Sequence, residues 1–130
     1  LITERLSGEN RIVDKPSIKN NESIIKVSAI SIDDLELKNG IDFLKIDTEG
    51  SEFLILKGAK NTLEKSRNGI ALVENNNFQE IFKLFNDIGW KVFDINSQGK
   101  LILEIESLKK AYNLICVGPE HPLNKRIFFN

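Results

Sequence analysis

Three carboxylates follow two apolar stretches of the sequence, where strands are expected to end. Asp47 and Glu49 come directly after the mostly apolar run 41–46, and Glu74 ends the next apolar run, 70–73. In an open α/β sheet, ligands bind beyond the carboxyl ends of parallel strands. We therefore expect the three carboxylates to share one crevice. Carboxylates grouped in this way can accept a substrate proton, bind an ammonium or sulfonium group, or hold a divalent cation.

Each of these acids also has a structural explanation. A helix is expected to begin near Ser51, and its dipole stabilises acids in or before the first turn. For Glu49 this explanation and a chemical role are equally open, whereas helix capping is favoured for Glu52 and a functional role for Asp47. Glu74 can be an ordinary solvated strand end.

Three other reactive side chains are interpreted as structural. Lys45 is unexpected in a strand between helices, because a buried lysine is costly unless it is paired. We expect it to form an ion pair with Asp47 or with an acid from a neighbouring strand, or else to extend past the sheet edge into solvent. Cys116 lies in an apolar run and is expected to be a small buried hydrophobe. His121 lies between prolines and an acid in a stretch that is typical of a loop.

Composition narrows the class of protein. The chain has 130 residues, of which 41% are hydrophobic, and a formal net charge of −1. These values predict one globular domain, 1–130, in which 1–23 is an irregular lead-in. No stretch is apolar and long enough to span a membrane, no secretory signal is visible, and no broad basic field indicates nucleic-acid binding. We expect a cytoplasmic protein that acts on a small molecule.

The order of the expected elements predicts an α/β fold. Strands that alternate with helices imply right-handed crossovers and a parallel sheet. The last two strands have no helix between them and imply an antiparallel edge. The expected strands are 24–30, 43–47, 70–73, 90–95, 101–105 and 113–117, with a turn at 96–99.

Two helices are expected between these strands. The first begins near Ser51 and continues to Lys65, and the second is capped by Asn77 and ends at Gly89. A short element before them is expected to begin at a Ser31 cap. The buried faces of the two helices are expected to be Glu52, Leu56, Ala59 and Leu63, and Phe78, Ile81, Phe82, Phe85 and Ile88.

One pattern suggests a different chemistry. The residues from Asp47 to Ser51, placed after an apolar strand, resemble the opening motif of haloacid-dehalogenase-like phosphatases, which is Asp-x-Asp-Gly-Thr. Here Glu49 replaces the second aspartate and Ser51 the threonine. That motif usually lies near the start of its domain, whereas strands precede it here. A magnesium-dependent phosphatase is therefore the weaker alternative.

A longer set of residues resembles the FkbM family of methyltransferases. It comprises Ile32 to Leu35, Ile41 to Phe53, Leu56 to Ala59 with Leu63, Ala71 to Glu74, Leu84-Phe85 with Gly89 to Phe93, and Asn113 to Val117. The resemblance extends from about Val27 to Pro119. It implies a class I methyltransferase that uses S-adenosylmethionine on a Rossmann-like sheet. It also implies O-methyl transfer to a hydroxyl group of a sugar or secondary metabolite.

The resemblance assigns roles to the strand-end acids. Asp47 stands where such enzymes hold the cofactor amine or the acceptor, and Asp47 and Glu49 are the candidate catalytic residues. Glu74 is a candidate for binding the acceptor, and no metal ligand is expected. A carboxylate in this place can assist methyl transfer by taking the hydroxyl proton.

The chain departs from the family's pattern in its cofactor site. The glycine-rich turn after the first strand of the family, and the acid after the second, are not found, and the eight glycines include no G-x-G pair. We therefore expect only the C-terminal part of the methyltransferase sheet, with parallel strands, helices and an antiparallel edge. Such a fragment would lack most of the S-adenosylmethionine pocket and be inactive alone. Its uncovered edge would favour a homodimer or rearranged packing. A non-catalytic binding or assembly module is the main alternative.

Overall fold

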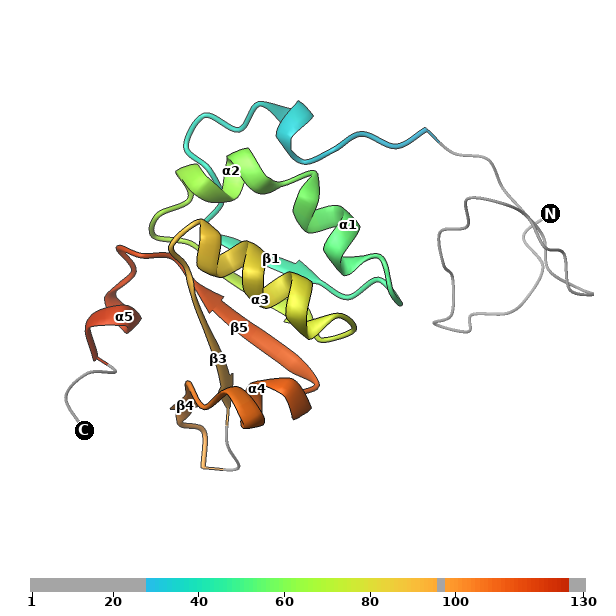
Figure 1. Ribbon diagram of the computed structural model, residues 1–130. Coiled ribbons are helices and arrows are strands. Elements are labelled where there is room, and N and C mark those ends of the chain that lie inside the picture. Colours follow the sequence, from blue (N-terminus) through green and yellow to red (C-terminus); the bar gives the residue numbers. More distant parts are fainter. Residues whose placement is uncertain (1–27, 96–97, 127–130) are drawn as a thin grey trace, which may run out of the picture.

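The computed structural model in Figure 1 describes residues 28–95 and 98–126 and has a mixed α/β fold, as expected. The lead-in 1–23, most of the strand expected at 24–30 and half of the turn expected at 96–99 lie outside these residues. The described elements are η1 (Asp33–Leu35), β1 (Phe43–Ile46), α1 (Glu52–Lys57), α2 (Lys60–Lys65), β2 (Ile70–Glu74), α3 (Phe78–Asp87), β3 (Lys91–Ile95), β4 (Leu101–Ile102), α4 (Ile105–Lys110), β5 (Asn113–Val117) and α5 (Pro122–Arg126).

The five described strands form one sheet in the order β1-β2-β5-β3-β4. The pair β1–β2 is parallel, and the pairs β2–β5, β5–β3 and β3–β4 are antiparallel. Because β2 and β3 both run opposite to β5, they share one direction. The prediction of a parallel sheet is therefore confirmed only in part.

The antiparallel edge expected from the closing strands is confirmed only in part, by the antiparallel pairing of Leu101 and Ile102 with β3. Strand β5, in contrast, lies inside the sheet, where Val117 pairs with Ile70 of β2 and with Lys91 of β3. The physical reason is its apolarity, since Leu114 and Cys116 are fully buried and need neighbours on both sides. The short β4 takes the edge instead.

Helices α1, α2 and α3 cover one face of the sheet (Figure 1). The predicted stripe along the first helical region is confirmed, because Leu56, Ala59 and Leu63 are completely buried. Burying a leucine side chain contributes about 1.5–3 kcal/mol relative to leaving it exposed. The indole Nε1 of Trp90 donates a hydrogen bond of 3.2 Å to the carbonyl of Leu63 and so joins α2 to the start of β3. The predicted stripe of α3 also faces this core through Ile81, Phe85, Phe78, Phe82 and Ile88.

The single helix expected from Ser51 to Lys65 is in fact two helices that break at Gly58. A Cβ on Gly58 would lie 3.0 Å from the Cβ of Ser31, so the neighbouring segment packs closely there. The backbone N–H of Asp33 donates a 2.8 Å hydrogen bond to the Gly58 carbonyl. The break is therefore fixed by a segment far upstream in the sequence.

The region after β4 was also predicted wrongly. We expected a strand over 101–105, but only Leu101–Ile102 pairs with β3, and α4 begins at Ile105. Helix α4 has an acid in its first turn and two lysines in its last, which is a helix signal that the apolar run concealed. Leu108 is 1% exposed and completes the core. Helix α5 was not expected either.

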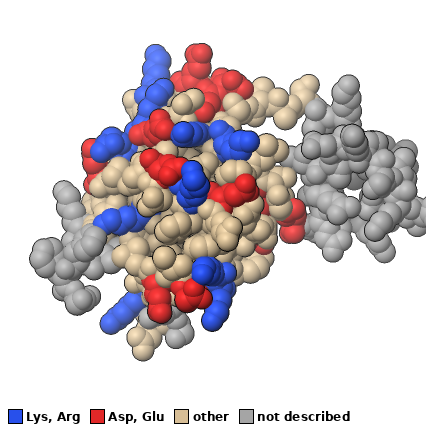
Figure 2. All heavy atoms as spheres, in the orientation of Figure 1, with Lys and Arg blue, Asp and Glu red and all other residues tan. Residues whose placement is uncertain are grey.

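The surface carries mixed charge. On the face in Figure 2, basic and acidic side chains are interspersed and do not gather in a large patch of one sign. No described helix has the length and apolarity that a membrane crossing requires.

Candidate functional site

Two of the predicted acids lie at the same end of the sheet. Strands β1 and β2 are parallel neighbours, and their register pairs Ile46 with Val73. Asp47 follows Ile46 and Glu74 follows Val73, so both acids come at the carboxyl ends of adjacent strands. This is the placement that the sequence pattern predicted.

Tyr112, which the sequence analysis missed, lies at the same end of the sheet as Asp47 and Glu74. The pKa of its phenol is raised, chiefly by the nearby Glu74 carboxylate and to a smaller extent by burial and by the negative charges of Asp47 and Glu49. Tyr112 immediately precedes β5, whose first residue, Asn113, pairs with Glu74. Because β5 is antiparallel, its beginning lies where β1 and β2 end. The tyrosine side chain is 75% exposed.

Asp47 is held by the lysine of its own strand. The Nζ of Lys45 lies 2.9 Å from Oδ2 of Asp47, so the expected pairing is confirmed. The side chain of Lys45 is also 58% exposed, which agrees with the alternative of a lysine that extends past the sheet edge. No described strand pairs with the far side of β1, and Phe43, two residues before Lys45, is also exposed. An ion pair this exposed contributes about 0–1 kcal/mol to stability.

The turn between β1 and α1 has two residues with positive φ. Glu49 has φ 54° and Gly50 has φ 104°. The left-handed conformation is costly for a residue with a Cβ, whereas glycine adopts it readily. The turn reverses the chain after Asp47 and presents the Glu49 side chain to solvent.

Glu52 holds this turn together from its inner side. Its side chain is 1% exposed. Oε1 accepts hydrogen bonds from the Thr48 N–H at 2.8 Å and from the Thr48 hydroxyl at 3.0 Å. The Gly50 N–H approaches both carboxylate oxygens, at 3.2 and 3.1 Å. Glu52 lies in the first turn of α1, as expected, but its carboxylate reaches back to donors before the helix and closes the turn that carries Glu49.

Asn76, also missed from the sequence, connects this turn to the neighbouring strand. Its Nδ2 donates to Oε2 of Glu52 at 3.0 Å and to Oε2 of Glu74 at 3.1 Å. Glu74 is 7% exposed, so both acceptors are buried carboxylates. The run of three asparagines after Glu74 was the available signal, since polar residues at a strand end are candidates for a site.

The charge state of Glu52 follows from these contacts. Burial raises the pKa of its carboxyl group, but the hydrogen bonds from Asn76 and from the backbone outweigh burial and lower the pKa from 4.5 to about 2. The side chain is therefore an anion at neutral pH, and the N–H and hydroxyl donors around its two oxygens stabilise the negative charge.

Comparison with known proteins decides the family. The sequence matches the family described as "Methyltransferase FkbM domain" over residues 2–113. The chain belongs to the FkbM methyltransferase family. The match begins at residue 2, so it includes the lead-in that we had placed before the resemblance. No curated protein and no solved structure matched the sequence.

In this FkbM domain the strand-end cluster consists of Asp47, Glu49, Glu74 and Tyr112. Its three carboxylates can accept hydrogen bonds or a proton, and together they favour a cationic or hydroxylated ligand. Among the residues that the structure describes, no three His, Cys, Asp or Glu side chains are grouped as metal ligands. The roles of the individual acids stay predictions.

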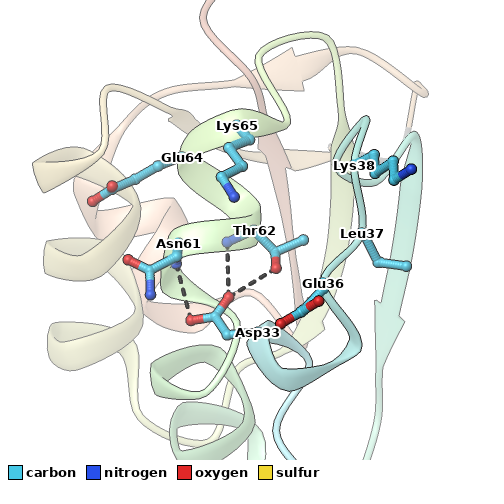
Figure 3. Close-up of a pocket in the computed structure, with 8 residues that line it drawn as sticks. All are labelled: Asp33, Glu36, Leu37, Lys38, Asn61, Thr62, Glu64 and Lys65. Carbon is cyan, nitrogen blue, oxygen red and sulfur yellow. Dashed lines mark hydrogen bonds between the residues drawn. The ribbon is translucent and has the colours of Figure 1, made fainter.

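A hollow of the FkbM domain lies between η1 and α2, away from the strand-end acids. It has a volume of about 720 Å³ and is open to solvent. Asp33 is one of the residues that line it, and Figure 3 shows this carboxylate turned toward the first turn of α2. It accepts bonds from Asn61 N–H at 3.1 Å and from the N–H and hydroxyl of Thr62, both at 2.8 Å. Its acceptor capacity is thus used in capping a helix, and none of the strand-end acids lines this hollow.

The other reactive side chains are structural, as expected. Cys116 is fully buried, and burial raises the pKa of its thiol well above the usual value. His121 precedes α5, and its Nδ1 accepts a 3.1 Å hydrogen bond from the Leu123 N–H.

Proposed function

We propose that this protein takes part in S-adenosylmethionine-dependent methyl transfer to the hydroxyl group of a small acceptor such as a sugar or secondary metabolite. The family match over 2–113 carries the proposal. The arrangement of acids at the carboxyl ends of β1 and β2 is consistent with it, because ligands of open α/β sheets bind beyond the carboxyl ends of the strands. The same match favours methyl transfer over the phosphatase alternative.

The acids at this end of the sheet can bind the positively charged part of such a cofactor. S-adenosylmethionine, when bound, supplies an activated methyl group on a sulfonium, together with an ammonium group. Carboxylates are the side chains that accept hydrogen bonds from an ammonium and attract a positive charge. We assign this task to Asp47, which is accessible at the strand end.

The acids at this end of the sheet also suit the acceptor. An exposed carboxylate, Asp47 or Glu49, takes the proton of the acceptor hydroxyl as its oxygen forms the new bond. Glu74 is held by Asn76 and orients the acceptor by accepting a further hydrogen bond. Because the methyl donor is already activated, alignment of the reacting atoms accounts for most of the rate gain.

We further propose that these 130 residues hold the acidic half of the site. Sequence outside them would then supply the glycine-rich cofactor turn, and the isolated chain would bind S-adenosylmethionine weakly and transfer no methyl group. Calorimetry with S-adenosylmethionine on the chain and on the product of the complete coding sequence tests this division. Tight binding only to the complete product is expected, and no saturable binding to either would contradict the proposed function.

The role of Asp47 has a matched control in the same strand region. In the complete product, Asp47→Asn should reduce methyl transfer to a panel of hydroxyl acceptors by about 100-fold, the usual contribution of a positioned acid or base. The melting temperature should stay unchanged because Asp47 is exposed. Asp42→Asn makes the same change at the other end of β1, where Asp42 is exposed, and should keep full activity. Equal activity of the two variants would remove Asp47 from the site.

As the alternative, a binding or assembly module would keep the fold without turnover. It predicts the same stability and saturable ligand binding, but no methylated product with any acceptor. The observation that leaves it open is the missing glycine-rich turn.

A further inference from the structure

Capping of α1 does not account for all the contacts of Glu52. A helix cap needs acceptors for the first free N–H groups. Glu52 instead accepts bonds from Thr48 and Gly50, which lie before the helix, and a bond from Asn76 in the loop after β2. Only the last of these contacts links it to the neighbouring strand.

Asn76 is placed between two buried negative charges. Its amide group has two N–H donors, and the Nδ2 atom lies within hydrogen-bond distance of Glu52 and Glu74 at the same time. Two carboxylates that share a site repel each other and disfavour ionisation, unless donors lie between them. The asparagine amide supplies these donors without adding charge of its own.

We propose that Glu52 and Asn76 are positioning residues for the strand-end acids. Glu52 fixes the turn that carries Asp47 and Glu49, and Asn76 couples that turn to the Glu74 carboxylate. The relative placement of the acids from β1 and from β2 is then set by one buried hydrogen-bonded chain. The role of this link in catalysis rests on the proposed methyl transfer. The hydrogen-bonded link from Glu52 through Asn76 to Glu74 is a property of the folded chain and can be tested without it.

Tyr112 provides a direct measurement of this coupling, because it is the only tyrosine in the sequence. The pKa of its phenol is raised by the nearby Glu74 carboxylate and by the charges of Asp47 and Glu49. Phenolate absorbance during an alkaline titration therefore reports where the acids are, and circular dichroism at each pH confirms that the chain stays folded. A residue that only supports the fold would not change this titration in a folded variant.

The experiment is a double-mutant cycle on the 130-residue chain with Glu52→Gln and Asn76→Ala. Asn76→Ala should lower the pKa of Tyr112. Without the amide that holds it, the Glu74 carboxylate moves away from the phenol and raises its pKa less. Glu52→Gln should lower it as well, and its effect should fall by about half or more once Asn76 is alanine, as expected for residues in one network. Asn86→Ala, the same change on the exposed face of α3, should leave the titration unchanged.

Two results would overturn the proposal. An unchanged Tyr112 pKa in Asn76→Ala would mean that Asn76 does not position Glu74. Strictly additive shifts would mean that Glu52 serves its own turn alone. If Glu52→Gln does not fold, Thr48→Val, which removes one donor to the same carboxylate, replaces it in the cycle.

Binding of S-adenosylmethionine to the complete coding product separates this inference from the proposed function. Asn76→Ala should weaken binding about tenfold, equivalent to about 1.4 kcal/mol, and Asn86→Ala should not. If the unmodified protein binds no S-adenosylmethionine, the proposed function fails, whereas the Tyr112 cycle still decides the positioning role. If it binds and Asn76→Ala binds equally well, the coupling does not serve this ligand.

Discussion

Asp33 and Glu52 are two carboxylates with nearly the same local chemistry and different surroundings. Each accepts bonds from two backbone N–H groups and one threonine hydroxyl. For both, the hydrogen bonds outweigh burial and lower the pKa. The donors of Asp33 all belong to α2, so Asp33 only caps the N-terminus of that helix. Glu52 has one additional partner, Asn76, which connects it to Glu74. One amide contact thus separates a helix cap from a candidate positioning residue.

The two regions should differ most in how much the Glu52 and Asp33 carboxylates contribute to the free energy of unfolding as the pH falls. The pKa of Glu52 is about 2 in the folded chain and 4.5 in the reference state, so its stabilisation is complete above about pH 5 and disappears as the pH falls toward 2. The difference corresponds to about 3 kcal/mol. Urea unfolding at a series of pH values should show a smaller acid loss for Glu52→Gln than for the unmodified chain. Parallel curves for the two proteins would contradict the low pKa.

Removing the helix cap tests the other half of the comparison. Asp33→Ala should lower the free energy of unfolding by about 1–2 kcal/mol, because the first turn of α2 loses its acceptor. The Tyr112 titration should stay as in the unmodified chain. A changed Tyr112 pKa would show that the two carboxylate regions are coupled and that the proposed distinction between them is wrong.

The two threonines offer a pair of closely matched changes. Thr48→Val and Thr62→Val each remove one hydroxyl donor from a carboxylate while preserving the shape of the side chain. Each should cost about 1 kcal/mol in urea unfolding. Only Thr48→Val should change the chemical shift of the Gly50 amide, because only this threonine shares an acceptor with Gly50. The same shift in Thr62→Val would remove the distinction.

The smallest effect is expected at the exposed ion pair of β1. Lys45→Ala should change the free energy of unfolding by no more than about 0.5 kcal/mol, because both partners are exposed to solvent. A loss of several kcal/mol would mean that this face of β1 is covered in solution.

Local pattern predicted the parts of the fold that depend on neighbours in the sequence. The buried stripe through Leu56 and Leu63 follows from helical spacing, and the Ser31 cap from its distance to Asp34, which it bonds through both its backbone and its hydroxyl. The common end for Asp47 and Glu74 was predictable because a helical crossover makes β1 and β2 parallel. The break at Gly58 was not predictable, because it depends on a contact with Ser31 that is distant in sequence.

The amino-acid sequence by itself determined the α/β class, the family and the two strand ends that carry Asp47, Glu49 and Glu74. It could do so because side-chain periodicity and motif spacing are local. Only the tertiary structure decided that Asn76 bonds to Glu74 and that Tyr112 lies at the same end of the sheet. Tyr112 arrives there because β5 runs antiparallel inside the sheet, and Asn76 because the loop after β2 folds over the first turn of α1. Both depend on which segments pack together, and packing between distant segments has no period in the sequence.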